Sequence, residues 1–93
     1  MLLEDAIPRA SAKPAAYVLA PLDRRFLYKG SSRDLRGRLQ DHQAGRAGRT
    51  KNHRPLDLLF FRYFETYREA QAMERWLKSG VGRKWLREKF TPL

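Results

Sequence analysis

The sequence contains no cysteine, which excludes disulfide bonds and metal sites built from thiolates. It has only two histidines, His42 and His53, and their separation matches no recurrent zinc motif. No apolar run is long enough to span a membrane. A metal ion bound by this chain would therefore be a hard ion held by carboxylate and water oxygens.

Acidic residues are scarce relative to basic ones. Ten Asp and Glu stand against 20 Lys and Arg, so the net charge of the 93 residues is +10. Folding does not require this excess, because it adds self-repulsion to a small domain. Phosphate polymers are the commonest partners of such proteins, although solvated helix faces give a similar composition. The N-terminus lacks a signal-peptide pattern, and we expect a cytoplasmic location.

The excess positive charge is concentrated in two blocks. Residues 33–54 contain seven basic and two acidic residues, and residues 75–89 contain six basic and one acidic residue, so each block carries +5. The segment between them, residues 56–67, is nearly neutral. This distribution predicts basic surfaces mounted on an apolar core.

Three short apolar segments predict strands. Residues 17–20 and 26–28 are separated by turn-forming residues and predict a β-hairpin, whose second strand ends at residues 30–32. Residues 56–64 form a near-continuous apolar run, which favours a central, well-buried strand.

Capping signals and apolar periodicity predict three helices. Ser32 is the expected N-cap of a helix over residues 34–44. A capping box at residues 66–69 opens a helix over residues 67–78, and a shorter helix over residues 83–90 follows two glycines.

The order of elements is β-β-α-β-α-α, which predicts an α+β fold with a small three-stranded antiparallel sheet flanked by helices. Residues 1–14 have no periodicity, and we expect them to form a mobile lead-in. Residues 15–91 are expected to form a single domain.

A carboxylate lies on the apolar side of the predicted helix over residues 67–78. Glu74 falls within the arc of Ala70, Met73 and Leu77. Burying it is unfavourable unless the carboxylate is paired or bound to a cation. Two interpretations remain open at this point, a metal ligand and a salt bridge to Lys78 one turn further on.

The helix over residues 34–44 also places polar groups along its leucine edge. Arg38 and His42 share the edge of Leu35 and Leu39, whereas Arg36 points away. An Arg held against the sheet can bind a phosphate with its planar fork of donors, or it can pack its stem on the core with its head in water. A histidine at a helix end is more often structural than catalytic.

Two tyrosines complete the set of candidate residues. If the hairpin turn pairs Leu22 with Arg25, Tyr17 lies opposite Gly30 and on the same face as Tyr28. Tyrosines are also simply good strand formers, so the pair is ambiguous alone. With Arg38 and Glu74 they supply the parts of a phosphodiesterase: hydroxyls, a guanidinium for phosphate and a carboxylate for a metal ion.

These residues in this order resemble the GIY-YIG endonuclease superfamily. Residues 15–17 (AAY) correspond to its Gly-Ile-Tyr motif and residues 28–30 (YKG) to its Tyr-Ile-Gly motif. Arg38, His42 and Glu74 match its helix Arg, the following His or Tyr, and its metal-binding Glu. The resemblance covers residues 16–90, and the runs TKNHRP and MERWLKSGVGRKWL are similar to the small stand-alone bacterial branch.

The chain departs from the family pattern at three points. The first motif has lost its Gly and Ile, and the second carries Lys29 in place of an apolar residue. Larger members use an Asn after the metal-binding Glu, whereas the only Asn here is Asn52.

The resemblance implies an Mg²⁺- or Mn²⁺-dependent endonuclease that hydrolyses DNA phosphodiester bonds in DNA repair or processing. Glu74 would hold one divalent ion, and Arg38 would stabilise the transition-state charge. Tyr17, its pKa lowered by neighbouring cations, would deprotonate or orient the attacking water. Tyr28 and His42 would position water or phosphate.

The expected substrate is DNA, contacted through its backbone and without base reading, in the bacterial cytoplasm or at the nucleoid. Cutting both strands could require a second copy or a partner protein. Two alternatives remain, a non-catalytic module binding DNA or RNA and a basic protein-interaction domain. The residues expected to contact the backbone are Lys29, Arg33, Arg46, Arg49, Lys51, Arg54, Lys78, Arg83, Lys84 and Arg87.

Overall fold

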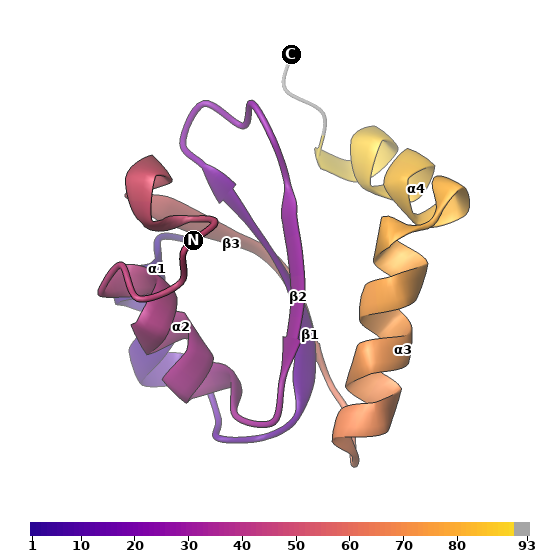
Figure 1. Ribbon diagram of the computed structural model, residues 1–93, viewed down its shortest axis with the longest axis horizontal. Helices are drawn as coiled ribbons and strands as arrows, with labels where there is room; N and C mark the ends of the chain where they lie inside the picture. The colour runs from indigo at the N-terminus through magenta and orange to yellow at the C-terminus, as the bar shows by residue number, and fades with distance from the viewer. Residues whose placement is uncertain (91–93) are drawn as a thin grey trace.

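A three-stranded antiparallel sheet separates two layers of helix in the computed structural model, which describes residues 1–90 (Figure 1). The strands are β1 (Ala15–Pro21), β2 (Tyr28–Ser32) and β3 (Leu56–Tyr63), in the spatial order β2-β1-β3. The predicted α+β fold class is therefore confirmed. The expected end of the domain, residue 91, lies outside the described residues.

Strand β1 forms the centre of the molecule, and all seven of its residues are buried. Successive side chains of a strand point to opposite faces. Tyr17 and Leu19 accordingly pack into the layer that contains Leu35 and Leu39, whereas Val18 packs into the layer that contains Leu77. The single strand β1 thus supplies side chains to both halves of the core.

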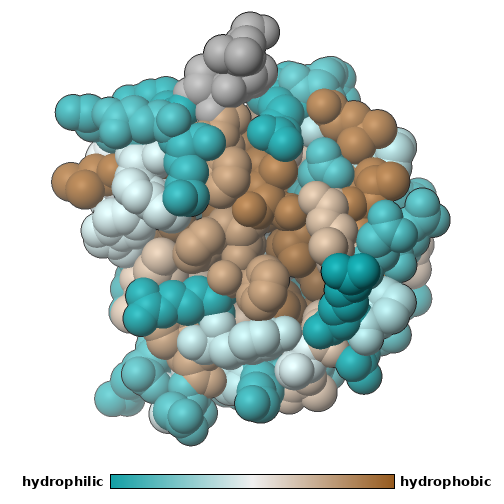
Figure 2. Space-filling view, turned by 180° about the vertical axis from the view of Figure 1, so that it is seen from behind, coloured by the Kyte–Doolittle hydropathy of each residue, from teal (hydrophilic) through white to brown (hydrophobic). Residues whose placement is uncertain are grey.

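The prediction that residues 56–64 form the central strand is wrong. Among the three strands, β3 is hydrogen-bonded to β1 alone and lies at the edge of the sheet, and Phe61 on it is 46% exposed. Near the start of β3, Met1 covers the outer edge of the strand, and its carbonyl oxygen accepts the Leu58 N–H at 2.7 Å. Figure 2, a view from behind, shows the apolar side chains gathered on this face; an open depression here is lined by Met1, Leu58, Leu59, Phe60 and Phe61.

Residues 1–14 are structured, in contrast to the mobile lead-in that the sequence suggested. They form the helix α1 (Leu3–Ala6) and the 3-10 helix η1 (Ile7–Arg9). Leu3 and Ala6 are buried and belong to the same core cluster as Tyr17. α1 has only four residues and is followed at once by the 3-10 helix that contains Pro8, so no regular helical period continues along the segment.

The first helical layer is completed by α2 (Leu35–Gln43), which begins one residue later than predicted. Its N-cap is Asp34, whose Oδ1 accepts the Gly37 N–H at 2.9 Å. Ser32, the predicted cap, instead lies in β2, which does not end at residue 30. The Ser32 hydroxyl accepts the Asp34 N–H at 3.0 Å and so supports the turn before the helix. The loop after α2 contains the 3-10 helix η2 (Lys51–His53).

The second layer consists of α3 (Tyr67–Lys78) and α4 (Gly80–Phe90). The capping box between Thr66 and Glu69 is present, and α3 has the predicted bounds. α4 begins at Gly80 rather than at residue 83, so the two glycines lie inside the helix instead of ending one. None of the helices in residues 1–90 has the length and apolar character needed to cross a membrane.

Gly82 is inside a helix because α4 packs directly on the backbone of α3. A Cβ at this position would overlap the carbonyl oxygen of Trp76, whereas a Cβ at Gly80 would have no neighbour within 4 Å. Gly82→Ala should lower the free energy of unfolding by about 1–3 kcal/mol, because two main chains would have to separate. The matched Gly80→Ala variant should stay within about 0.5 kcal/mol of the wild type. Urea denaturation measures both, and equal values would contradict this packing.

Candidate functional site

The ring of Tyr17 lies across Gly30 of the neighbouring strand. The two residues are direct partners in the β1–β2 pairing, as the hairpin register predicted. A Cβ at Gly30 would lie only 2.6 Å from the Tyr17 hydroxyl oxygen. Gly30 therefore lets the phenol of the central strand extend over β2 toward the edge of the sheet.

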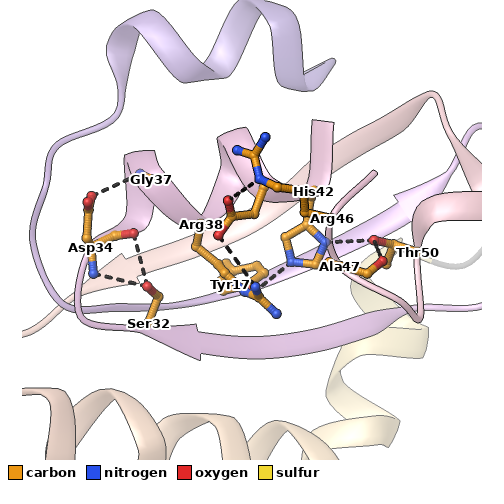
Figure 3. A network of polar contacts seen from close by, with 10 residues as sticks. Tyr17, Ser32, Asp34, Gly37, Arg38, His42, Arg46, Ala47 and Thr50 are labelled. Atoms are coloured by element: carbon orange, nitrogen blue, oxygen red, sulfur yellow. Dashed lines mark hydrogen bonds and ion pairs between the residues drawn. The ribbon is translucent and has the colours of Figure 1, made fainter. Parts of the chain in front are cut away.

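A buried chain of hydrogen bonds begins at the Tyr17 hydroxyl (Figure 3). Its oxygen lies 2.9 Å from Nε2 of His42, and Nδ1 of His42 lies 2.7 Å from the Thr50 hydroxyl oxygen. The Thr50 hydroxyl donates to the carbonyl oxygen of Ala47 at 3.4 Å. Because that proton is committed, Thr50 accepts from Nδ1–H, and Nε2 is left to accept the Tyr17 proton.

His42 is neutral in this environment. Burial lowers its pKa to about 4; the positive charge of Arg38 adds to this effect, and Asp41 opposes it. The side chain is fully buried at the end of α2, on the leucine edge where the sequence placed it. A neutral imidazole with an unprotonated Nε2 can accept a proton from the Tyr17 hydroxyl, to which it is hydrogen-bonded.

The structure contradicts the expectation that cations lower the pKa of Tyr17. Burial raises this pKa strongly; the charges of Tyr28 and Glu74 raise it further, and only Arg38 lowers it. The hydroxyl therefore stays protonated at neutral pH. The sequence shows the surrounding charges but not that the phenol is 1% exposed, and burial outweighs the nearby cation.

Arg38 and Tyr28 lie beside this hydroxyl. The ring of Tyr28 stands 5.1 Å from that of His42 and 6.3 Å from that of Tyr17, measured between centroids. Burial alone would lower the pKa of Arg38, but the two tyrosines outweigh it and raise the pKa. The side chain of Arg38 remains 35% exposed and also forms a 3.7 Å ion pair with Asp41. The guanidinium is thus held in place and open to an anion.

Glu74 belongs to the other helical layer. Its Oε1 accepts the Ser31 hydroxyl at 2.5 Å, and its Oε2 accepts the Lys78 ammonium at 2.6 Å. The Glu74 side chain is 24% exposed. The structure therefore contains the salt bridge to Lys78 that the sequence left as one of two interpretations.

The predicted site residues come from opposite faces of the sheet. Tyr17, Tyr28, Arg38 and His42 lie on the α2 side, and Glu74 lies on the α3 side. β2 separates the two groups, and it is an edge strand only five residues long. A substrate lying along the free edge of β2 can reach both groups.

An open groove of ≈ 630 Å³ lies at the start of this edge, where Phe26 and Leu27, just before β2, also line it. Tyr28 and Lys29 of β2 line it, with Arg49 on the α2 side and Lys78 on the α3 side. Burial lowers the pKa of Lys29, and the positive charges of Arg83 and Lys78 lower it further. Cations from three separate segments therefore converge beside the candidate catalytic groups.

The remaining predicted backbone contacts fall into two groups. Three of these arginines already have partners within the chain: Arg33 lies 4.2 Å above the Tyr67 ring, Arg46 pairs with Asp41 at 2.9 Å, and Arg54 donates to backbone carbonyl oxygens. The structure thus brings only part of the predicted basic surface to the groove. The others are exposed on the loop after α2 and on α4: Lys51, Arg83, Lys84 and Arg87.

Two residues of this arrangement, Ser31 and Thr50, were not among the predicted site residues. Ser31 follows Lys29 by two residues on β2, so both side chains lie on the α3 face of the sheet. This spacing was the signal in the sequence that could have identified Ser31. Thr50 gave no signal, because nothing in the sequence distinguishes it from an ordinary threonine in a loop. Both become identifiable only through their contacts.

Glu74 is the residue that could hold a metal ion. No cluster of three or more His, Asp or Glu side chains suited to a metal ion occurs within residues 1–90. One partly exposed carboxylate suits a hard divalent ion that keeps several waters and takes its other ligands from a phosphate. The Lys78 ammonium on Oε2 shows that this oxygen already accommodates a cation. The donor set fits such an ion.

Comparison with known proteins identifies the family. A family model described as the GIY-YIG catalytic domain matches residues 13–87. No curated protein and no solved structure matches the chain. The protein belongs to the GIY-YIG family; it is a nuclease of the hydrolase class, and its substrate is nucleic acid.

The low pKa of His42 predicts that acid destabilises the fold. In the unfolded chain its pKa is about 6.5, so between pH 6.5 and pH 4 the unfolded state binds a proton that the folded state does not. Stability should therefore fall as pH drops through this window, by on the order of 3 kcal/mol. Urea denaturation at about pH 7 and about pH 4.5 measures the loss. A His42→Gln variant should show a smaller pH dependence; an equal dependence would contradict the assignment.

Proposed function

We propose that this protein is an endonuclease that uses one divalent ion, Mg²⁺ or Mn²⁺, to hydrolyse DNA phosphodiester bonds. The observation that carries the proposal is the meeting of Tyr17, Tyr28 and Arg38 beside a basic groove, across a five-residue edge strand from Glu74. Two hydroxyls, a guanidinium and a carboxylate can together orient water, stabilise the charge on a phosphodiester and hold a metal ion.

The hydrogen-bond chain supports a proton relay. An attacking water gives a proton to the Tyr17 oxygen as Tyr17 passes its own proton to Nε2 of His42, 2.9 Å away. Hydroxide is thereby delivered to phosphorus and His42 becomes imidazolium, held by the Thr50 oxygen. Because Tyr17 never becomes a stable phenolate, the relay is compatible with its raised pKa. The low pKa of His42 favours return of the proton once the bond has broken.

Arg38, Tyr28 and Glu74 act on the phosphate. The exposed fork of Arg38 donates to the phosphate oxygens that gain negative charge, and the Tyr28 hydroxyl orients the phosphate beside it. Glu74 and Ser31 would hold the divalent ion, which supplies Lewis-acid stabilisation of the phosphate and the leaving oxygen.

The groove favours binding through the backbone, without base reading. Its polar lining is basic, and such side chains contact phosphates irrespective of sequence. This supports an activity that is not sequence-specific; from the family resemblance we further propose a role in DNA repair or processing, selective for DNA structure, in the bacterial cytoplasm or at the nucleoid. Cutting both strands would take a second copy or a partner protein. One observation favours a second candidate, a non-catalytic nucleic-acid-binding module: both Glu74 oxygens already have partners.

Glu74→Gln separates the two candidates. Cleavage of labelled nicked, branched, single-stranded and duplex DNA with Mg²⁺ or Mn²⁺ should fall at least about 100-fold, since the amide does not replace the anionic ligand. DNA affinity should be unchanged or slightly higher, because a negative charge beside the groove is removed. The matched control is Glu65→Gln, an exposed position outside the groove, which should cleave normally. Undiminished cleavage by Glu74→Gln would overturn the proposal.

His42→Gln tests the relay. The amide can still accept a hydrogen bond from Tyr17 but cannot take its proton, so kcat should fall about 100-fold or more while DNA affinity stays the same. Thr50→Ser keeps a hydroxyl on Nδ1 and should retain most of the activity. A His42→Gln enzyme with normal kcat would show that the proton leaves by another route.

A further inference from the structure

Lys78 can pair either with Glu74 or with an anion bound in the groove. Its ammonium lies 2.6 Å from Glu74 Oε2, yet its side chain is 56% exposed and lines the groove along β2. Exposed ion pairs one helical turn apart contribute little to stability, about 0.2–1 kcal/mol. A substrate anion can therefore draw Lys78 away from Glu74 without disturbing the fold.

The polar side chains between β2 and α3 form two successive cross-element pairs. Ser31 and Glu74 form the first pair, and Lys29 and Lys78, which both line the groove, form the second. Two residues along a strand span roughly 6.6 Å and four residues along a helix roughly 6 Å, so the spacing between the two pairs is similar on β2 and on α3. The second pair lies nearer the start of α4, where Arg83 adds a third cation.

This cluster of positive charge is only partly compensated. Within residues 1–90, the Lys78–Glu74 pair is the one ion pair that involves any of these three cations. Lys29 is half-buried among like charges, which is unfavourable in the free protein. A multivalent anion in the groove would relieve this repulsion.

We propose that Lys29, Lys78 and Arg83 form a binding site for a backbone phosphate of the nucleic acid, one step along the groove from Glu74, and that Lys78 exchanges Glu74 for this phosphate. The exchange frees Oε2 for the divalent ion, so nucleic acid and metal strengthen each other's binding. Only this coupling rests on the proposed function. In the free protein, the Lys78 ammonium occupies the position beside Glu74 Oε2 that the divalent ion would take.

Binding of a fluorescent single-stranded DNA oligonucleotide in EDTA tests the phosphate site without cleavage. Lys29→Gln, Lys78→Gln and Arg83→Gln should each weaken binding about three- to tenfold and lower the slope of log K against log salt by about 1. Lys13→Gln, which removes the same charge outside the groove, should have less than a third of this effect. Equal losses in Lys78→Gln and Lys13→Gln would overturn the site.

Binding of Mn²⁺ without nucleic acid, followed by the EPR signal of the free ion, tests the exchange. Removing the competing ammonium in Lys78→Gln should tighten Mn²⁺ binding about two- to fivefold, and Glu74→Gln should abolish it. A structural salt bridge would predict no such gain, and unchanged Mn²⁺ affinity would overturn the exchange. If the exchange fails while Glu74→Gln remains inactive, the nuclease assignment stands and only this inference falls.

Discussion

Burial of β1 on both faces is the constraint on which the arrangement depends. A strand covered by two helical layers must send alternate side chains into each, and Ala15 to Pro21 do so without a polar group other than the Tyr17 hydroxyl. That hydroxyl needs a partner, because an unpaired buried polar group is destabilising by about 1–3 kcal/mol. His42 supplies the partner, and the fold thereby fixes the geometry of the candidate proton relay.

Because the sheet has only three strands, the buried Tyr17 of the central strand lies close to the sheet edge, where a ligand can bind. Because β2 is an edge strand and Gly30 has no side chain, the Tyr17 ring can extend across β2 toward the free edge of the sheet. A wider sheet would leave Arg38 and Glu74 on separate faces, unable to act on one phosphate. Three strands bring both within reach of a ligand along one edge, which is how a domain of 93 residues can combine two helical layers in one site.

Local rules predicted what depends on neighbours in sequence. The capping box of α3, the leucine edge of α2 and the Tyr17–Gly30 register follow from periods of 3.6 and 2 and from a short turn. The position of β3 did not follow, because an apolar run fits an edge strand packed between two layers as well as a central one. The pKa of Tyr17 and the roles of Ser31 and Thr50 depend on burial and on contacts between distant segments, which no local pattern contains.

The basic side chains differ in whether they have hydrogen-bond or ion-pair partners within the protein. Arg46 is bound to Asp41, and Arg54 to backbone carbonyls, so these arginines brace the loop that carries Thr50 and act on the site from a distance. Lys29 has no such partner within residues 1–90, and Lys78 has one that is exposed and weak. Arg54, which donates to two backbone carbonyl oxygens of its own loop, is therefore a structural cation, whereas Lys29 and Lys78 remain available to an anion in the groove. Net charge alone cannot draw this distinction, because both kinds contribute equally to +10.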